Sequence, residues 1–355
     1  MRDDVPQRKL DHLRICAEES VQGGLDSGLE QYRLRHNALP GLSLADVETG
    51  TRFFGRALRA PLLISPMTGG TRNAREVNLN LARAAQALGL AMGVGSQRAA
   101  IEDPSLASTY QVREVAPDIL LLANLGAVQL NYGFGLDECR TAVRMIGADA
   151  LVLHLNPLQE ALQAGGNTDF SGLLEKIRCI CAGLDAPVIV KEVGSGLSGD
   201  VVRGLVRAGV SAVDVAGAGG TSWSQVESHR AHESRRRRTA EAFACWGIPT
   251  AEAILEARRA APDTPIVASG GIGTGPHAAT AIALGADMVG IGRPLLAAAM
   301  ESAESVQEEL TIVIDSLRIA MFCAAVPDTG SLKKAPLDCV PSAPCARIPD
   351  RGARP

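Results

Sequence analysis

The sequence has 355 residues, of which 46% are apolar and 21% are charged, and its formal net charge is −4. This composition is typical of a globular protein with a large core and is unlike that of a disordered or fibrous chain. The small negative charge gives no general reason to expect nucleic acid as a partner, so an anionic ligand would need a local cluster of cations.

No stretch reaches the roughly 18 consecutive apolar residues of a membrane span. The N-terminal MRDDVPQRKLDH also lacks the apolar region of a signal peptide. The eight cysteines are scattered, and the spacing of Cys179 and Cys181 fits neither a CxxC redox pair nor a zinc site. We therefore expect reduced thiols, no membrane insertion and a cytoplasmic protein.

Eight short apolar runs recur along the chain, and each ends in glycine or a polar residue. Most successive runs start about 22 to 37 residues apart, which is close to the length of one strand-helix unit. Their continuous hydrophobicity is typical of parallel strands that are covered on both faces. The runs are 62–65, 90–94, 119–124, 150–156, 187–192, 212–216, 265–269 and 287–291.

The segments between the runs, such as 73–88 and 200–208, have the pattern of helices. The sequence therefore predicts an α/β fold, a (β/α)8 TIM barrel over residues 61–325 whose closing helix is 301–324. Residues 1–60 are expected to form an N-terminal extension that packs on the barrel. Residues 326–355 are expected to form an irregular, mobile C-terminal tail.

The longest gap between runs follows the sixth run, and residues 222–261 within it are a candidate active-site loop. The rival architecture is a doubly wound sheet, which needs a GxGxxG turn after its first strand. The first run leads instead into SPMTGG, and the GAGG at 217–220 follows the sixth run and lacks the acidic partner of a dinucleotide site.

The functional residues of a TIM barrel lie at the C-terminal ends of its strands. Here the seventh and eighth runs end in glycines whose backbone can approach a phosphate closely. Lys191 ends the fifth run, where its charge could stabilise a reduced flavin. An ion pair between Lys191 and Glu192 at the rim is an equally good interpretation of that position.

An ordered set of motifs resembles the type 2 isopentenyl diphosphate isomerase family, whose members are FMN-dependent barrels. The resemblance covers roughly residues 7–325, and HLNPLQE together with GGTSW is its most specific part. The motifs are Arg8-Lys9-x-x-His12, SPMTGG at 65–70, GSQR at 95–98, ANLGA at 123–127, HLNPLQE at 154–160, VKEVGSG at 190–196, DVAGAGGTSW at 214–223 and ASGGI at 268–272.

The resemblance implies FMN, Mg2+ and NADPH, the last as reductant of the flavin, and a homo-oligomer, either a tetramer or an octamer. It implies FMN binding by Ser65, Met67, Thr68, Gly69, Ser96, Asn124, Lys191, Thr221, Gly271, Ile272, Gly273, Gly292 and Arg293. It implies binding of a prenyl diphosphate by Arg8, Lys9, His12, Ser96, Gln97, Arg98, Gln159 and Trp223, and of Mg2+ by Glu160. The implied catalytic residues are Gln159, His154 and Asn156.

Moving a double bond by one carbon requires one proton to be added and another to be removed. The amide of Gln159 is a poor acid, so our hypothesis is that reduced FMN is the acid-base group, that Gln159 orients or relays, and that no net redox change occurs. Two other classes stay open, a 2-hydroxy-acid oxidase and a non-enzymatic flavin-binding or phosphate-binding barrel. The oxidase needs a histidine base on a late loop, whereas His277 follows Pro276 inside an expected helix.

Several of these residues also have simpler interpretations. His154 alone would more often be a hydrogen-bonded core histidine, and Glu160 alone a solvated rim carboxylate. Trp223 could pack under its own loop. The arginine run 235–238 is assigned no site because such runs usually form a solvated face.

Overall fold

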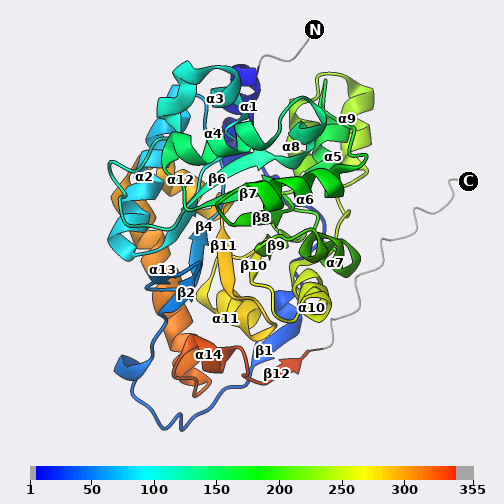
Figure 1. Cartoon of the computed structure of the whole chain (residues 1–355). Helices are drawn as coiled ribbons and strands as arrows, with labels where there is room; N and C mark the ends of the chain where they lie inside the picture. The colour runs from blue at the N-terminus through cyan, green and yellow to red at the C-terminus, as the bar shows by residue number, and fades with distance from the viewer. Residues whose placement is uncertain (1–4, 341–355) are drawn as a thin grey trace, which may run out of the picture.

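A computed structural model describes residues 5–340, and its centre is a closed barrel of eight parallel strands, β4 to β11 (Figure 1). The barrel closes because β11 pairs with β4. The strands are β4 (Leu62–Ile64), β5 (Ala91–Gly93), β6 (Leu121–Gly126), β7 (Ala150–His154), β8 (Val188–Lys191), β9 (Ala212–Asp214), β10 (Ile266–Ser269) and β11 (Met288–Ile291). They fall in order on the eight predicted runs, so the predicted TIM barrel is confirmed.

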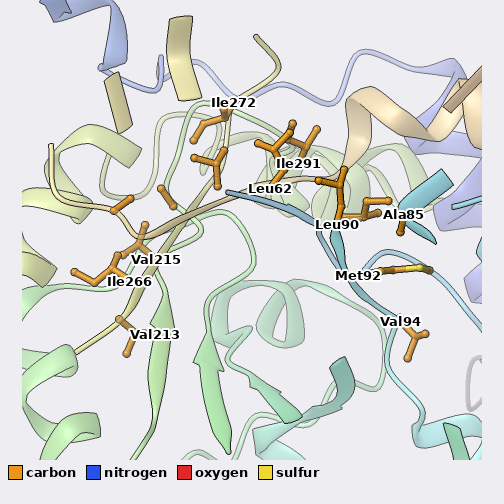
Figure 2. Packing of buried hydrophobic residues seen from close by; sticks show 14 of the residues in the cluster. Leu62, Ala85, Leu90, Met92, Val94, Val213, Val215, Ile266, Ile272 and Ile291 are labelled. Atoms are coloured by element: carbon orange, nitrogen blue, oxygen red, sulfur yellow. The ribbon is translucent and has the colours of Figure 1, made fainter. Parts of the chain in front are cut away.

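Alternate residues of each strand point to opposite faces, and both faces are buried. Leu62 and Ile64 pack outward against the helices, whereas Leu63 lies in a separate cluster inside the barrel. Figure 2 shows part of this outward layer, in which Leu62 lies near Ile291 and Leu90 lies near Ala85. This double burial explains why the strands have continuous apolar runs rather than alternating ones.

Helices connect the strands and cover the outside of the barrel. They are α2 (Arg72–Leu88), α3 (Arg98–Glu102), α4 (Leu136–Ile146), α5 (Pro157–Leu162), α6 (Leu173–Gly183), α7 (Gly199–Arg207), α8 (Trp223–Arg230), α9 (Ser234–Glu241), α10 (Thr250–Ala260), α11 (Gly275–Ala283), α12 (Leu296–Glu301) and α13 (Ala303–Cys323). The described residues also form five short 3-10 helices: η1 (Leu29–Gln31), η2 (Leu44–Asp46), η3 (Pro104–Thr109), η4 (Ala127–Asn131) and η5 (Arg293–Leu295). The candidate loop 222–261 contains α8 and α9 before the barrel helix α10.

A hairpin of β2 (Thr51–Phe53) and β3 (Arg56–Leu58) closes the N-terminal end of the barrel. Phe53 and Leu58 belong to the same buried cluster as the inward-facing strand residues, such as Leu63. The hairpin therefore acts as an apolar plug, which leaves the opposite end of the barrel for ligands.

The opposite, C-terminal end is covered by α1 (Val5–Glu18). Ile15 of α1 packs with Val21 and with Val226 of α8. Arg293, which follows β11, donates a hydrogen bond from Nε to the carbonyl oxygen of Cys16 at 3.3 Å. The first helix of the N-terminal extension thus lies over the barrel mouth (Figure 1).

The segment expected to form an irregular tail from residue 326 begins with regular structure. It contains α14 (Thr329–Leu332) and β12 (Leu337–Cys339), which pairs antiparallel with β1 (Tyr32–Leu34). This two-stranded sheet ties the C-terminal segment to the N-terminal extension beneath the barrel (Figure 1). Residues 341–355, the rest of the expected tail, lie outside the described residues.

Within residues 5–340, no helix has both the length and the apolar character needed to span a bilayer. The seven cysteines in this range are free thiols.

Candidate active site

The C-terminal strand ends form a polar layer on top of the apolar barrel interior. His154 on β7 donates from Nδ1 to Oδ1 of Asn124 on β6 at 2.9 Å. Lys191 on β8 lies 3.6 Å from Oδ2 of Asp214 on β9, and Ser269 on β10 donates to Oδ1 of the same aspartate at 2.6 Å. Polar groups from five neighbouring strands therefore face one mouth.

The carboxylate that pairs with Lys191 is Asp214 and not Glu192. Lys191 donates to the backbone oxygen of Glu192 at 2.7 Å, while the Glu192 side chain accepts hydrogen bonds from the backbone N–H groups of Val193, Gly194 and Ser195. Burial raises the pKa of Glu192 to about 7, although these N–H groups oppose the change. The rim ion pair considered from the sequence is thus replaced by a buried one.

His154 is a half-buried, hydrogen-bonded histidine. Its pKa is lowered to about 4, mainly by burial and in part by the charge of Lys191, while a hydrogen bond with the backbone of Leu125 acts in the opposite direction. The imidazole is therefore neutral at pH 7. This agrees with the interpretation of a core histidine and leaves the catalytic role of His154 a prediction.

Asn156, Gln159 and Glu160 meet where β7 leads into α5. Asn156 donates from Nδ2 to Oε1 of Gln159 at 3.0 Å and to Oε1 of Glu160 at 3.1 Å. The other carboxylate oxygen of Glu160 accepts from Nε2 of Gln163 and from the backbone N–H of Asn167, both at 2.6 Å. The structure thus brings these predicted residues together.

The environment of Glu160 fits a metal ligand. Glu160 is only 8% exposed, so it is not a solvated rim carboxylate. Among the described residues, Oδ1 of neighbouring Asn156 is buried without a hydrogen-bond partner. The described chain has no cluster of three or more His, Cys, Asp or Glu side chains for a metal. One carboxylate suits Mg2+, which usually keeps water and substrate phosphates as its other ligands.

Cations gather above this cluster. The pKa of Arg8 is lowered, mainly by burial. The charge of Glu160 opposes this change, and the charges of Arg230 and Arg98 add to it, so all three groups lie near Arg8. Burial, together with the charge of Arg8, lowers the pKa of Lys9 to about 7. The predicted residues Arg8, Lys9 and Arg98 are therefore close together, and Arg230 joins them.

Helix α8 supplies two residues that the sequence reasoning missed, Glu227 and Arg230. Glu227 accepts from Nε2 of His12 at 2.9 Å and from Nη1 of Arg230 at 2.8 Å. Burial is the largest single influence and raises the pKa of Glu227, but the hydrogen bonds and charges of His12 and Arg230 together outweigh it, so the pKa is lowered. Trp223 lies edge-on to the His12 ring at 5.1 Å. The spacing of Glu227 and Arg230, three residues apart in the candidate loop 222–261, was the sequence pattern that could have indicated them.

The loop after β4 has the close packing expected around a planar cofactor. A Cβ atom on Gly69 would lie 1.9 Å from the ring of Tyr110, and one on Gly95 would lie 2.4 Å from the carbonyl oxygen of Thr68. The hydroxyl oxygen of Ser65 is buried without a hydrogen-bond partner among the described residues. Met67 lies beside Gly292, where a Cβ would come within 3.9 Å of its Cγ. The loop therefore offers bare backbone and an unpaired hydroxyl.

The glycines after β10 form a second cradle. Gly270 and Gly271 have positive φ angles of 103° and 73°, which favour glycine. A Cβ on Gly220 would lie 2.5 Å from the backbone nitrogen of Gly271, so the Thr221 loop touches this turn. The turn continues through Ile272 and Gly273 to the N-terminus of α11. Together with Arg293 from the next strand end, these residues fit a phosphate group.

One predicted substrate residue is placed differently. Gln97 is fully buried, and its Nε2 donates to the backbone oxygen of Ala142 at 2.9 Å. Its Oε1 accepts from the backbone N–H of Asn124, also at 2.9 Å. Gln97 therefore braces the barrel wall, whereas the carbonyl oxygen of Ser96 before it faces Lys9 at 3.2 Å.

The sequence model of the FMN-dependent dehydrogenase family matches residues 1–111 and 149–338. A Synechococcus protein named isopentenyl-diphosphate delta-isomerase is 54% identical over 93% of this chain and 95% of its own length. A protein of the same name from Stutzerimonas stutzeri is 52% identical over 95% of this chain and 98% of its own length. The chain belongs to the isopentenyl-diphosphate delta-isomerase family. The resemblance to the type 2 isomerases is thereby confirmed, and FMN is supported as cofactor.

The chain also shares its fold with solved structures of low sequence identity. The crystal structure of mandelate oxidase with benzoyl-formic acid superposes with a TM-score of 0.65, covering 96% of both chains at 20% identity. This similarity establishes the barrel fold alone. His277, the histidine considered for an oxidase base, lies on α11 with its Nε2 3.5 Å from Oε1 of Glu30.

Proposed function

We propose that the protein interconverts isopentenyl diphosphate and dimethylallyl diphosphate as an FMN- and Mg2+-dependent isomerase with no net redox change. The observation that supports this best is the hydrogen-bonded group of Asn156, Gln159 and Glu160 close to the cations of α1. The names and the high identity of the relatives support the substrate. The glycine cradles and the unpaired Ser65 hydroxyl support a bound flavin.

The charged groups suit a diphosphate. Arg8, Lys9 and Arg98 converge where Glu160 could hold Mg2+ against phosphate oxygens. Such charges act strongly in a mouth covered by α1, because little water screens them. His12 and Trp223 would then face the prenyl portion.

The mouth also restricts which groups can move a proton. Neutral His154 cannot act as an imidazolium acid at pH 7, and Gln159 is an amide, held by Asn156, that can orient a substrate or relay. When bound and reduced by NADPH, FMN would supply the acid-base group. Lys191, anchored by Asp214, lies where it can stabilise negative charge in this layer.

The direct test is anaerobic incubation of the purified protein with isopentenyl diphosphate, FMN, Mg2+ and NADPH. We expect dimethylallyl diphosphate to form while far less than one NADPH is consumed per product. Oxidation of lactate or glycolate in air, without isomer formation, would support an oxidase instead. Flavin binding with neither reaction would support a non-enzymatic barrel.

Assembly as a tetramer or octamer and a cytoplasmic location stay predictions of the sequence. Light scattering on the eluting protein would measure the assembly directly.

A further inference from the structure

Tyr110 joins two parts of the mouth that are separate in the sequence. It follows η3, and its side chain is fully buried. Its hydroxyl accepts a hydrogen bond from Nζ of Lys9 at 2.6 Å and donates one to the carbonyl oxygen of Ser96 at 2.7 Å. Lys9 also donates to that carbonyl oxygen at 3.2 Å. The three groups form a closed triangle.

The ring of Tyr110 has a second neighbour, the loop after β4. Gly69 lies flat on it, since a Cβ at this position would be 1.9 Å from the ring. A Cβ on Gly70 would be 2.7 Å from Nζ of Lys9. The ring therefore supports the predicted flavin loop, and the hydroxyl holds the ammonium of α1.

We propose that Tyr110 is a positioning residue, whose hydroxyl fixes Lys9 for the diphosphate end of the substrate and whose ring supports the flavin loop. The first half of this proposal rests on the proposed function of the protein. Lys9 needs a positioning residue because a lysine side chain is flexible and carries its compact charge at the end of a four-carbon stem. Two fixed acceptors remove that freedom before the substrate arrives, so less ordering remains to be done on binding.

The chemistry of the tyrosine suits this role. Burial raises the pKa of Tyr110, so the hydroxyl stays protonated and donates to Ser96 while accepting from Lys9. The Lys9 ammonium also lies 5.3 Å from the centre of the ring, within the range of a cation–π contact. Hydroxyl and ring thus act on different partners, and separate substitutions can distinguish them.

Tyr110→Phe removes the hydroxyl and keeps the ring. We expect the KM for isopentenyl diphosphate to rise about 5- to 10-fold, because one of two hydrogen bonds to a charged group is lost. The kcat should change less than about twofold, because Lys9 binds the diphosphate equally in the ground state and the transition state. The Kd for FMN should stay unchanged, because the ring is kept. Tyr110→Leu should also weaken FMN binding because Gly69 loses its support.

A double-mutant cycle tests whether Tyr110 acts through Lys9. Lys9→Met should raise KM at least as much as Tyr110→Phe, and the double variant should be no worse than Lys9→Met alone. Additive effects would overturn the proposal, because the hydroxyl would then act independently of the ammonium. Tyr132→Phe is the matched control, since the Tyr132 hydroxyl accepts from the backbone of Asp169 at 3.1 Å, away from Lys9.

The outcomes separate this proposal from the proposed function. If the unaltered enzyme forms no isomer, the function fails, and calorimetric binding of inorganic diphosphate still tests the positioning of Lys9. If the enzyme is active and Tyr110→Phe has an unchanged KM, the positioning role fails alone. Unchanged FMN affinity in a folded Tyr110→Leu variant would overturn the role of the ring.

Discussion

Substrate affinity should depend on pH around neutrality because of Lys9. Burial, together with the charge of Arg8, lowers the pKa of Lys9 from 10.5 to about 7. An ammonium attracts a diphosphate only while it is protonated. Because the pKa lies below its ordinary value, this charge is lost as the pH rises through about 7, whereas an exposed lysine would keep it to about pH 10.

The size of the effect follows from the protonated fraction. At pH 6 about nine tenths of the free enzyme would have a charged Lys9, and at pH 8 about one tenth. If only the charged form binds well, the apparent KM rises about tenfold between these values, which corresponds to about 1.4 kcal/mol. Lys9→Arg keeps its charge over this range, so its profile should lack the rise.

The assay is the initial rate of isomer formation under anaerobic conditions, with FMN and Mg2+ saturating at every pH. Ionisation of the diphosphate itself is common to all variants, so the difference between the Lys9 and Lys9→Arg profiles isolates the lysine. Lys9→Met should have a high KM at every pH, and this KM should change with pH no more than that of Lys9→Arg. An identical rise in the unaltered enzyme and Lys9→Arg would refute the reasoning.

Three further substitutions test other parts of the site. Gly69→Ala should weaken FMN binding about tenfold or more in a fluorescence titration, because its Cβ would overlap the Tyr110 ring and overpacking costs about 1–3 kcal/mol; an unchanged Kd contradicts this. Lys191→Met should lower the free energy of unfolding in urea by about 3–5 kcal/mol, because Asp214 becomes a buried charge without its counter-ion. Adding Asp214→Asn should recover most of that loss, and no recovery would show that the pair is unimportant. Glu160→Gln should raise the Mg2+ concentration for half-maximal activity about tenfold or more, since a neutral amide is a weaker ligand; an unchanged Mg2+ requirement excludes Glu160 as ligand.

The barrel was predictable from the sequence because one physical constraint repeats eight times. Each strand is covered by helices outside and by other strands inside, so it must be apolar throughout. The apolar runs therefore predicted every barrel strand, with ends shifted by a few residues. The pairing of β12 with β1 was not predictable in this way, because short exposed strands have no continuous apolar pattern.

The ion-pair partner of Lys191 could not be predicted from adjacency in the sequence. Glu192 is next in sequence, but neighbouring residues of a strand point to opposite faces. Asp214 is the register partner of Lys191 on the next strand, so the two side chains share a face. Strand pairing, which the sequence predicted in order, was a better guide than adjacency.

Tyr110, Glu227 and Gln97 depend on tertiary contacts that no local pattern encodes. Tyr110 matters because α1 and the loop after β4 meet on its two sides, and Glu227 because His12 approaches from α1. Gln97 belongs to a motif of the family, yet its amide is bonded to the barrel wall. Membership in a motif therefore predicts location better than it predicts the contacts of each side chain.

The N-terminal helix connects closure of the mouth with binding of an anion. Arg8 and Lys9 are half-buried close to Arg98, so their mutual repulsion and lost hydration oppose the position of α1. Glu160 offsets only part of this positive charge. A diphosphate would offset more, so its binding should stabilise α1 in its position over the mouth by linkage.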